Sequence, residues 1–300
     1  MEGDSQRTDV VVGVDGSGES LVAAHWAALA ARRRGTGLRV VHAFTESVSQ
    51  SPDFTLPAAV NHEERRAAER TINRAAQSVT ASFPGLRLTT ELVQADARWA
   101  LVEASTGAWL TVVGTRGHGH LPDVIIGTVA HHVASHAHSP VAVVPASAVL
   151  DDDRPAGPIL VGVDAGDSCE AAIRYAFDEA AIAGCDVIAA LVVDDSTVPP
   201  FLRGPAHAGS EEDQREQSAL GGHLEVWREK YPDVQVRPVV LRGRPARALL
   251  DHAMALPPGG QPRMIVVGSR GHRGLATVLL GSVGRRLIAD SVWPVVVVRP

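Results

Sequence analysis

The heptapeptide at residues 112–118 (VVGTRGH) returns at residues 266–272 as VVGSRGH, so that Gly114 and Gly268 are 154 residues apart. In both places a run of apolar, β-branched residues ends in a glycine. Such a pattern predicts a buried strand followed by a loop whose backbone turns tightly. The repetition indicates that the chain contains the same fold twice.

Two other segments of the first half also return in the second half, in the same order. Residues 11–16 (VVGVDG) correspond to residues 160–165 (LVGVDA), and residues 139–144 (SPVAVV) correspond to residues 293–298 (WPVVVV). Because separate segments recur at nearly one spacing, the repeat extends over a whole domain rather than a single motif.

The length and composition of the chain agree with two folded domains. It has 300 residues, of which 45% are hydrophobic and 21% are charged, and about 150 residues is a common domain size. We expect residues 1–148 to form the first domain, residues 149–157 a linker, and residues 158–300 the second domain. The acidic run before Pro155 is typical of a solvated linker.

Short apolar runs alternate with helical segments in both halves. In the first half we expect strands at 10–14, 37–43, 87–93, 110–114 and 140–144, and helices at 19–34, 61–82, 97–106 and 127–137. Strands that alternate with helices indicate βαβ crossovers and a parallel sheet. Continuous apolar strands are typical of a sheet that helices cover on both faces. We therefore predict an α/β protein with two tandem, doubly wound domains, each built on a five-stranded parallel sheet.

Charge and residue usage exclude several functional classes. The net charge is −6 at pH 7, so the basic excess of a general nucleic-acid binder is missing. The single lysine, Lys230, lies in Glu-Lys-Tyr and not in the Gly-Lys-Ser/Thr of a P-loop. The two cysteines, Cys169 and Cys185, lack the spacing of a disulfide framework or of a metal site.

The sequence also carries expectations about location. It contains no apolar run of the roughly 18 to 20 residues that a membrane-spanning helix needs. Its first seven residues (MEGDSQR) are polar and lack the layout of a secretory signal. We therefore expect a cytoplasmic protein without a membrane span.

A glycine pattern with chemical meaning follows the fourth strand of each half. Three glycines at fixed spacing precede a hydroxyl residue: Gly114, Gly117, Gly127 and Thr128 in the first half, and Gly268, Gly271, Gly281 and Ser282 in the second. Glycines let backbone N–H groups approach an anion without a Cβ in the way. The last glycine and the hydroxyl residue begin a helix, whose first N–H groups favour negative charge. We interpret the pattern as a nucleotide-phosphate site; the alternative is that the glycines only form turns.

Other polar residues lie close to this pattern. Asp15 and Asp164 follow the first strand of each half and face the same crevice, where a carboxylate suits ribose hydroxyls or a metal bound to phosphates. His118 and His272 lie in the glycine loops and either contact phosphate or are solvated. Arg116 and Arg270 either contact phosphate or pair with surface acids.

A histidine pair in the first half suggests a second kind of site. His132 and His136 share one helix face, which is a spacing that zinc accepts. The second half has no counterpart to the pair, and no cysteine lies near it. A solvated, mildly pH-sensitive face is therefore the favoured interpretation.

The sequence resembles the tandem-domain, ATP-binding subgroup of the universal stress protein family. The resemblance rests on the two VGVD strand ends, on the glycine pattern in both halves, and on the two closing Pro-Val strands, and it covers nearly the whole chain. It implies strand order 3-2-1-4-5 in each domain, an adenine-nucleotide α-hydrolase-like fold, and ATP bound across the glycine pattern. Adenine is then expected at the backbone of the second strand, near Val41 and Ala190.

The resemblance and the residue patterns together give one set of expected nucleotide-binding residues. In the first domain these are Gly13, Asp15, Val41, Gly114, Gly117, His118, Gly127, Thr128 and Val129. In the second domain they are Gly162, Asp164, Ala190, Gly268, Gly271, His272, Gly281, Ser282 and Val283. We expect no catalytic residues and no metal held by the protein alone.

The expected function is that of an ATP-binding regulatory protein of the stress response, with one nucleotide site per domain. ATP, alone or with Mg²⁺, is the expected cofactor, turnover is slow or absent, and an unidentified protein is the expected partner. Family members pair through their last strands, so we expect the two halves to pair within the chain, and we also consider a homodimer. Arg285 and Arg286 replace His131 and His132, which predicts tighter binding in the second domain.

Two alternatives stay open. One is an ATP-hydrolysing or adenylating enzyme of the adenine-nucleotide α-hydrolase superfamily. Those enzymes carry their phosphate loop directly after the first strand, whereas here the glycine pattern follows the fourth. The other is a module that binds cyclic AMP, because the glycine pattern does not choose among adenine nucleotides.

Overall fold

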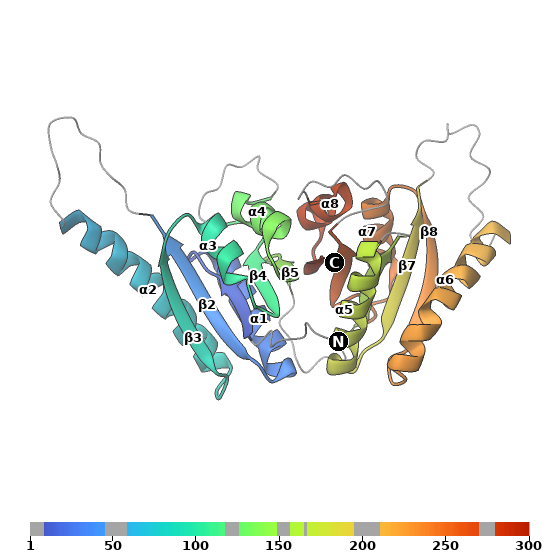
Figure 1. Cartoon of the computed structure of the whole chain (residues 1–300), viewed down its shortest axis with the longest axis horizontal. Helices are drawn as coiled ribbons and strands as arrows, with labels where there is room; N and C mark the ends of the chain where they lie inside the picture. The colour runs from blue at the N-terminus through green and yellow to red at the C-terminus, as the bar shows by residue number, and fades with distance from the viewer. Residues whose placement is uncertain are drawn as a thin grey trace. The chain divides into compact units, whose positions relative to one another are not determined.

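The computed structural model describes residues 9–45, 59–117, 126–148, 157–164, 167–194, 211–269 and 280–299. The chain divides into two compact units, Met1–Leu150 and Asp151–Pro300, which appear in Figure 1. Of the linker expected at residues 149–157, only Gly157 lies within the described residues. Within these ranges no helix is long and apolar enough to cross a membrane.

Unit 1 is a parallel sheet whose strands are joined by helices. Its elements are β1 (Asp9–Gly13), α1 (Gly18–Arg34), β2 (Gly37–Phe44), α2 (Ala59–Ser82), β3 (Leu88–Gln94), α3 (Ala97–Ala104), β4 (Leu110–Gly114), α4 (Thr128–His136) and β5 (Val141–Val144). The strand order is β3-β2-β1-β4-β5, with parallel pairing throughout. The predicted elements of this half are confirmed to within two residues.

Unit 2 repeats this arrangement. Its elements are β6 (Ile159–Val163), α5 (Asp167–Ala183), β7 (Val187–Val193), α6 (Glu211–Lys230), β8 (Val236–Arg242), α7 (Pro245–Ala255), β9 (Met264–Gly268), α8 (Ser282–Asp290) and β10 (Val295–Val298). The order β8-β7-β6-β9-β10 is again parallel. Both units therefore have the strand order 3-2-1-4-5, and the predicted doubly wound α/β fold is confirmed.

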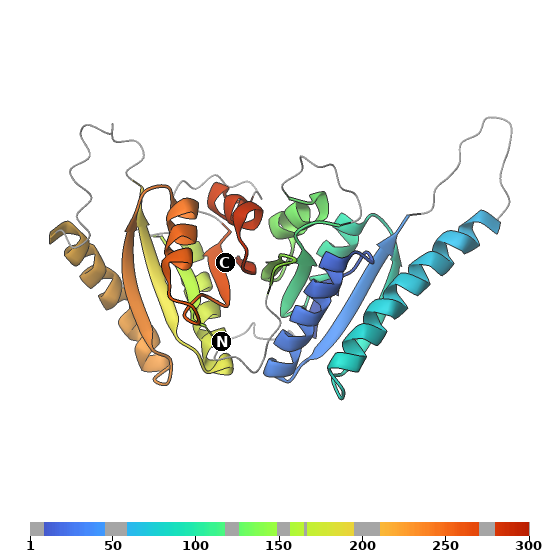
Figure 2. The same cartoon turned by 180° about the vertical axis from the view of Figure 1, so that it is seen from behind.

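Helices cover both faces of the sheet in unit 1. Helices α1 and α2 pack on one face, and α3 and α4 pack together on the other, as the two opposite views in Figures 1 and 2 show. Between these layers the strands are buried: Val10, Val11 and Val12 of β1 and Leu110 of β4 have no exposed surface. Burial on both faces explains why these strands are continuous apolar runs.

The order of the strands opens a crevice in unit 1. Strand β1 pairs with β2 on one side and with β4 on the other, so the chain leaves β1 and β4 toward opposite edges of the sheet. Loops diverge at such a switch point, and ligands of α/β folds bind there, beyond the carboxyl ends of the strands. Asp15, which we expected directly at the strand end, lies two residues beyond Gly13, the last residue of β1.

Helix α1 has a defined beginning and end. The side chain of Ser17 caps its first turn by accepting a hydrogen bond from the N–H of Ser20. At its other end Gly35 adopts φ = 68°, and its N–H bonds to the carbonyls of Ala31 and Arg32. This left-handed C-cap satisfies carbonyls that the helix leaves open, and it favours glycine because a Cβ is strained there.

Substitution Gly35→Ala should therefore destabilise unit 1 by about 1 kcal/mol, because alanine is strained at this backbone conformation. For a unit of this size we expect a melting temperature lower by about 2–4 °C, measured by differential scanning calorimetry. The matched control is Gly18→Ala at the start of the same helix, where an added Cβ meets nothing within 4 Å. It should melt at or above the wild-type temperature. A Gly35→Ala protein that melts no lower than wild type contradicts this account.

Candidate functional site

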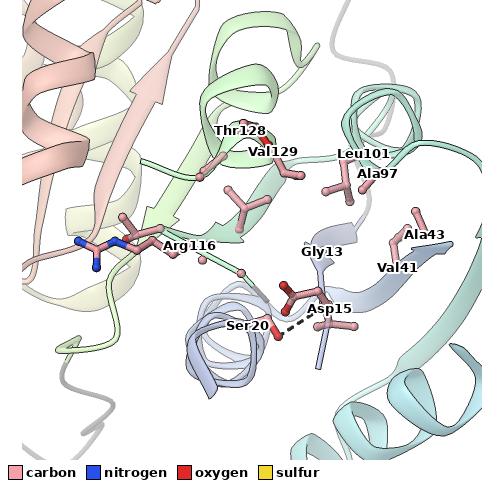
Figure 3. Close-up of a pocket in the computed structure, with 17 residues that line it drawn as sticks. Gly13, Asp15, Ser20, Val41, Ala43, Ala97, Leu101, Arg116, Thr128 and Val129 are labelled. Atoms are coloured by element: carbon pink, nitrogen blue, oxygen red, sulfur yellow. Dashed lines mark hydrogen bonds between the residues drawn. The ribbon is translucent and has the colours of Figure 1, made fainter. Parts of the chain in front are cut away.

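A cavity of about 400 Å³ lies at the crevice of unit 1. It is bounded by the carboxyl ends of β1, β2 and β4, by the loop that follows β4, and by the first turns of α3 and α4. Figure 3 shows the side chains that line it. Its volume lies within the roughly 300–1,000 Å³ of typical small-molecule sites.

The cavity brings together eight of the nine residues that we expected at this site. They are Gly13, Asp15, Val41, Gly114, Gly117, Gly127, Thr128 and Val129. The ninth, His118, lies outside the described residues. Segments that are far apart in the sequence therefore meet at one place, as the glycine pattern and the strand ends predicted.

Several lining residues were not anticipated from the sequence. They are Val14, Ser20, Ala43, Ala97, Leu101, Val113, Thr115 and Ala130. Most of them are small or apolar, so in the sequence they resemble ordinary core positions. Ala97 and Leu101 are four residues apart and therefore share one face of α3. This spacing shows which side of the helix turns inward, but it does not show that this side meets a cavity.

One end of the cavity is apolar. Val41 and Ala43 of β2 and Ala97 and Leu101 of α3 lie together there (Figure 3). Gly13 lets α3 come this close, because a Cβ at this position would lie 2.6 Å from Cδ1 of Leu101. The carbonyl of Val41 accepts the N–H of Val14 at 2.9 Å, so this carbonyl is already used within the fold. A flat apolar ring system suits such a surface.

A carboxylate lies between the two ends of the cavity. Oδ1 of Asp15 accepts the N–H of Ser17 at 2.9 Å, and the N–H of Asp15 donates to Oγ of Ser20 at 3.3 Å (Figure 3). A Cβ added at Gly117 would collide with Oδ2 of Asp15. The loop after β4 therefore lies directly against this carboxylate, and only glycine allows so close an approach.

The loop after β4 also uses some of its own amides. The N–H of Gly127 donates to the carbonyl of Thr115 at 2.9 Å, and the backbone N–H of Arg116 donates to Oε2 of Glu19 at 2.8 Å. A Cβ at Gly127 would lie 3.1 Å from that same carbonyl of Thr115. At these positions the glycine pattern permits close packing of the loop. The guanidinium of Arg116 points away from the cavity (Figure 3).

The first turn of α4 forms the polar end of the cavity. Thr128 and Val129 line it, and Gly127, the N-cap residue, makes no side-chain capping bond. The first N–H groups of a helix have no carbonyl partner within the helix, and the helix dipole adds positive potential. An anion that enters the cavity therefore meets donors at this turn.

Unit 2 has the same framework at its corresponding strand ends. Gly281 is the N-cap of α8, again without a side-chain capping bond, and its N–H donates to the carbonyl of Ser269 at 3.1 Å. Gly162 is paired with Ala190, and a Cβ at Gly162 would lie 3.2 Å from Cδ1 of Leu249. These contacts repeat those of Gly127 and Gly13 in unit 1.

The remaining expected residues of unit 2 fall into two groups. Asp164 follows β6, Gly268 ends β9, and Ser282 and Val283 begin α8. Gly271 and His272 lie outside the described residues, as does Arg270. Cys169 occupies the position of Ser20, and burial raises the pKa of its thiol to about 11.

Comparison with known proteins assigns the chain to a family. The model of the universal stress protein family matches residues 7–145 and again residues 156–299. The chain is 35% identical over 299 residues to a universal stress protein of Mycolicibacterium smegmatis, covering 97% of each chain. It is 34% identical over 294 residues to one of Mycobacterium tuberculosis, covering 97% of this chain and 96% of the relative. The chain belongs to the universal stress protein family.

Solved structures show the same fold across the whole chain. A universal stress protein from Archaeoglobus fulgidus is similar with a TM-score of 0.68 and 19% identity, covering 98% of this chain and 97% of that one. A putative universal stress protein from Pseudomonas aeruginosa is similar with a TM-score of 0.59 and 16% identity, covering 99% and 94%. The resemblance to this family that the sequence indicated is confirmed.

A seam of rings joins α3 to α4 in unit 1. The rings of His132 and His136 stack with centroids 4.2 Å apart, and the ring of Trp99 meets His132 edge-on at 4.5 Å. Nδ1 of His136 bonds to the carbonyl of His132 at 2.9 Å. Within the described ranges no group of three His, Cys, Asp or Glu side chains comes together as metal ligands. The histidine pair thus forms packing contacts between two helices that line the cavity.

The pKa of His132 is lowered, first by burial and then by the nearby charges of His136 and Arg98. Its Nε2 is buried without a hydrogen-bond partner. In the unfolded chain this histidine takes up a proton near pH 6.5, whereas in the folded chain it does so only at lower pH. Below pH 6.5 the unfolded state therefore binds more protons, and stability falls as the pH falls through the folded pKa.

His132→Phe should reduce this acid sensitivity, because phenylalanine keeps a ring against Trp99 and does not titrate. We expect the melting temperature to fall less between pH 7 and pH 5 in the variant than in the wild type. Thermal unfolding at both pH values measures the difference, and a melting temperature near that of wild type at pH 8 serves as the control for folding. An equal fall in both proteins contradicts the assignment of the effect to His132.

Proposed function

We propose that each unit binds one adenine nucleotide and that the protein is an ATP-binding regulator of the stress response. The observation that carries the proposal is the cavity of unit 1, which joins an apolar end to an uncapped helix N-terminus with a carboxylate between them. The flat aromatic faces of adenine, the hydroxyls of a ribose and an anionic phosphate chain match these three parts of the cavity in the same order. Membership of the universal stress protein family supports the same ligand.

The proposed placement of the nucleotide follows the lining of the cavity. Adenine lies against β2 and α3, where Ala43 and Leu101 offer apolar surface. The ribose hydroxyls donate to the carboxylate of Asp15, which Ser17 holds in place. The phosphates accept hydrogen bonds from the first-turn amides of α4 and from the hydroxyl of Thr128. Mg²⁺ accompanies ATP as its phosphate-bound counterion.

Phosphate binding at α4 distinguishes this proposal from an adenylating or ATP-hydrolysing enzyme. Those enzymes hold phosphate in the turn after the first strand. Here that turn leads into α1, whose N-terminus is capped by the side chain of its own Ser17. The turn after β4 instead leads into α4, whose N-cap Gly127 makes no side-chain bond. We therefore infer slow or absent turnover and a function in signalling, in which nucleotide state sets the affinity for a protein partner.

Two further expectations stay predictions. Pairing of the two halves through their last strands, and a homodimer of the chain, follow from the family resemblance.

Cyclic AMP is the second candidate ligand, because it offers the same base and ribose and one phosphate charge to the cavity. Mass spectrometry of small molecules released from the denatured protein separates these ligands. Recovered ATP supports the proposal, and no nucleotide together with no binding at millimolar ATP overturns it.

Substitution Gly127→Asp tests the phosphate end of the cavity in unit 1. Aspartate is a favoured N-cap residue whose carboxylate accepts first-turn amides, so it would occupy the donors that phosphate needs while keeping α4 capped. We expect one of the two binding equivalents for ATP to disappear in isothermal titration calorimetry. The residue's backbone conformation, φ = −61° and ψ = 143°, is open to any residue.

The matched control is Gly127→Ala. It places the same Cβ beside the carbonyl of Thr115 but adds no carboxylate, so it should keep both binding equivalents. A Gly127→Asp protein that still binds two equivalents of ATP would show that phosphate does not bind at α4. Loss of binding in both variants would assign the effect to crowding of the loop.

A further inference from the structure

The first turn of α1 places an acidic side chain on the loop that follows β4. Oε2 of Glu19 accepts the backbone N–H of Arg116 at 2.8 Å, across 97 residues of sequence. The contact is close on the backbone side as well, because a Cβ at Gly114 would lie 3.4 Å from the carbonyl oxygen of Glu19. Glu19 is therefore held against the loop and is half-buried there.

Two carboxylates contact the loop that follows β4. Asp15 lies against Gly117, and Glu19 holds the amide of the preceding residue, Arg116. Both acidic residues belong to the segment that joins β1 to the first turn of α1. The two carboxylates make the region beside the backbone of Arg116 and Gly117 negative, since the positive guanidinium of Arg116 points away from the cavity (Figure 3). The neighbouring first turn of α4, by contrast, favours anions.

The position of this negative region matters for a nucleotide in the proposed placement. In Figure 3 Arg116 lies on the side of the cavity opposite Val41 and Ala43, and Thr128 of the polar end lies between Arg116 and these two residues. A first phosphate reaches the amides of α4. Further phosphates extend beyond them toward Arg116, whose guanidinium points away from the cavity (Figure 3).

The second unit differs from the first in this segment, because residues 15–20 (DGSGES) correspond to residues 164–169 (DAGDSC). Counted from the aspartate after the first strand, Glu19 corresponds to Ser168, just as Asp15 corresponds to Asp164. The glycine pattern is the same in both units, so the two sites share their donors. In unit 2 the second acidic residue of this segment is Asp167, which corresponds to Gly18, so the two segments carry the same number of acidic residues and differ in where the second carboxylate is attached.

We propose that Glu19 determines phosphate preference in unit 1. Its charge weakens the binding of ATP relative to adenine nucleotides with fewer phosphates. The inference rests on the proposed nucleotide site and adds a specificity-determining residue to it. Because the effect is electrostatic, it grows with the number of phosphates and is weakened by salt.

Glu19→Gln tests the proposal, since glutamine keeps an oxygen that accepts the amide of Arg116 and removes only the charge. The substitution is made in a Gly281→Asp chain. There the aspartate is expected to occupy the first-turn amides of α8 and so to block the phosphate end of unit 2, as Gly127→Asp does at α4 in unit 1. Calorimetry with ATP, AMP and adenosine then reports on unit 1. We expect ATP to bind about three- to tenfold more tightly, AMP to gain less, and adenosine to remain unchanged.

Glu103→Gln in the same background is the control for net charge, because Glu103 is an exposed residue of α3 that does not line the cavity. It should leave all three affinities unchanged. The reciprocal variant Ser168→Glu, in a Gly127→Asp chain, should weaken ATP binding to unit 2 by a similar factor. This second variant tests the proposal independently if Glu19→Gln destabilises α1.

The outcomes distinguish a failure of the role proposed for Glu19 from a failure of the proposed nucleotide site. An equal gain for adenosine and ATP, or weaker ATP binding in Glu19→Gln, overturns the role of Glu19 while leaving the nucleotide site in place. A gain for ATP that does not shrink at high salt also overturns it. If the wild-type chain binds none of the three ligands, the proposed function itself fails.

Discussion

The parallel pairing of β1 with β4 is the constraint on which the rest of unit 1 depends. Val10 is paired with Leu110 and Val12 with Val112, in the middle of a sheet that helices cover on both faces. Because β1 also pairs with β2, the connections that follow β1 and β4 must leave in opposite directions. The ends of these two strands therefore stay open to a ligand while the middle residues of both strands are buried. The same parallel pairing recurs between β6 and β9 in unit 2.

Glycine in this fold acts mainly by letting protein atoms come close to one another. Gly13 makes room for Leu101, and Gly117 makes room for the carboxylate of Asp15. Gly127 closes the loop by donating to Thr115. The donors offered to an anion then come from the first turn of α4, which these contacts place at the cavity. A chain with a net charge of −6 and a single lysine can in this way present a local anion site.

Much of this arrangement was predictable from the sequence, because it depends on local patterns. Alternating apolar runs and helical segments predicted the elements, and the glycine spacing predicted strand ends that border the cavity of unit 1. The apolar end of the cavity was not predictable, since Ala43 and Leu101 are indistinguishable in sequence from core residues. The contact of Glu19 with Arg116 was equally hidden, because it joins the start of one helix to a loop 97 residues away. Such contacts depend on the packing of elements, which no local pattern records.

The two units show how one backbone carries different side-chain chemistry. Where unit 1 has the ring seam of Trp99, His132 and His136, helices α7 and α8 carry the ion pairs Arg247–Asp251 and Arg286–Asp290. The sequence suggested that Arg285 and Arg286 favour phosphate in unit 2. Nε of Arg286 lies 2.5 Å from Oδ2 of Asp290 on its own helix, so this carboxylate offsets part of the charge that the sequence suggested for phosphate. The exchange of Glu19 for Ser168 concerns a residue that in unit 1 contacts the loop after β4 directly, while Asp167 in place of Gly18 keeps the number of acidic residues in this segment the same.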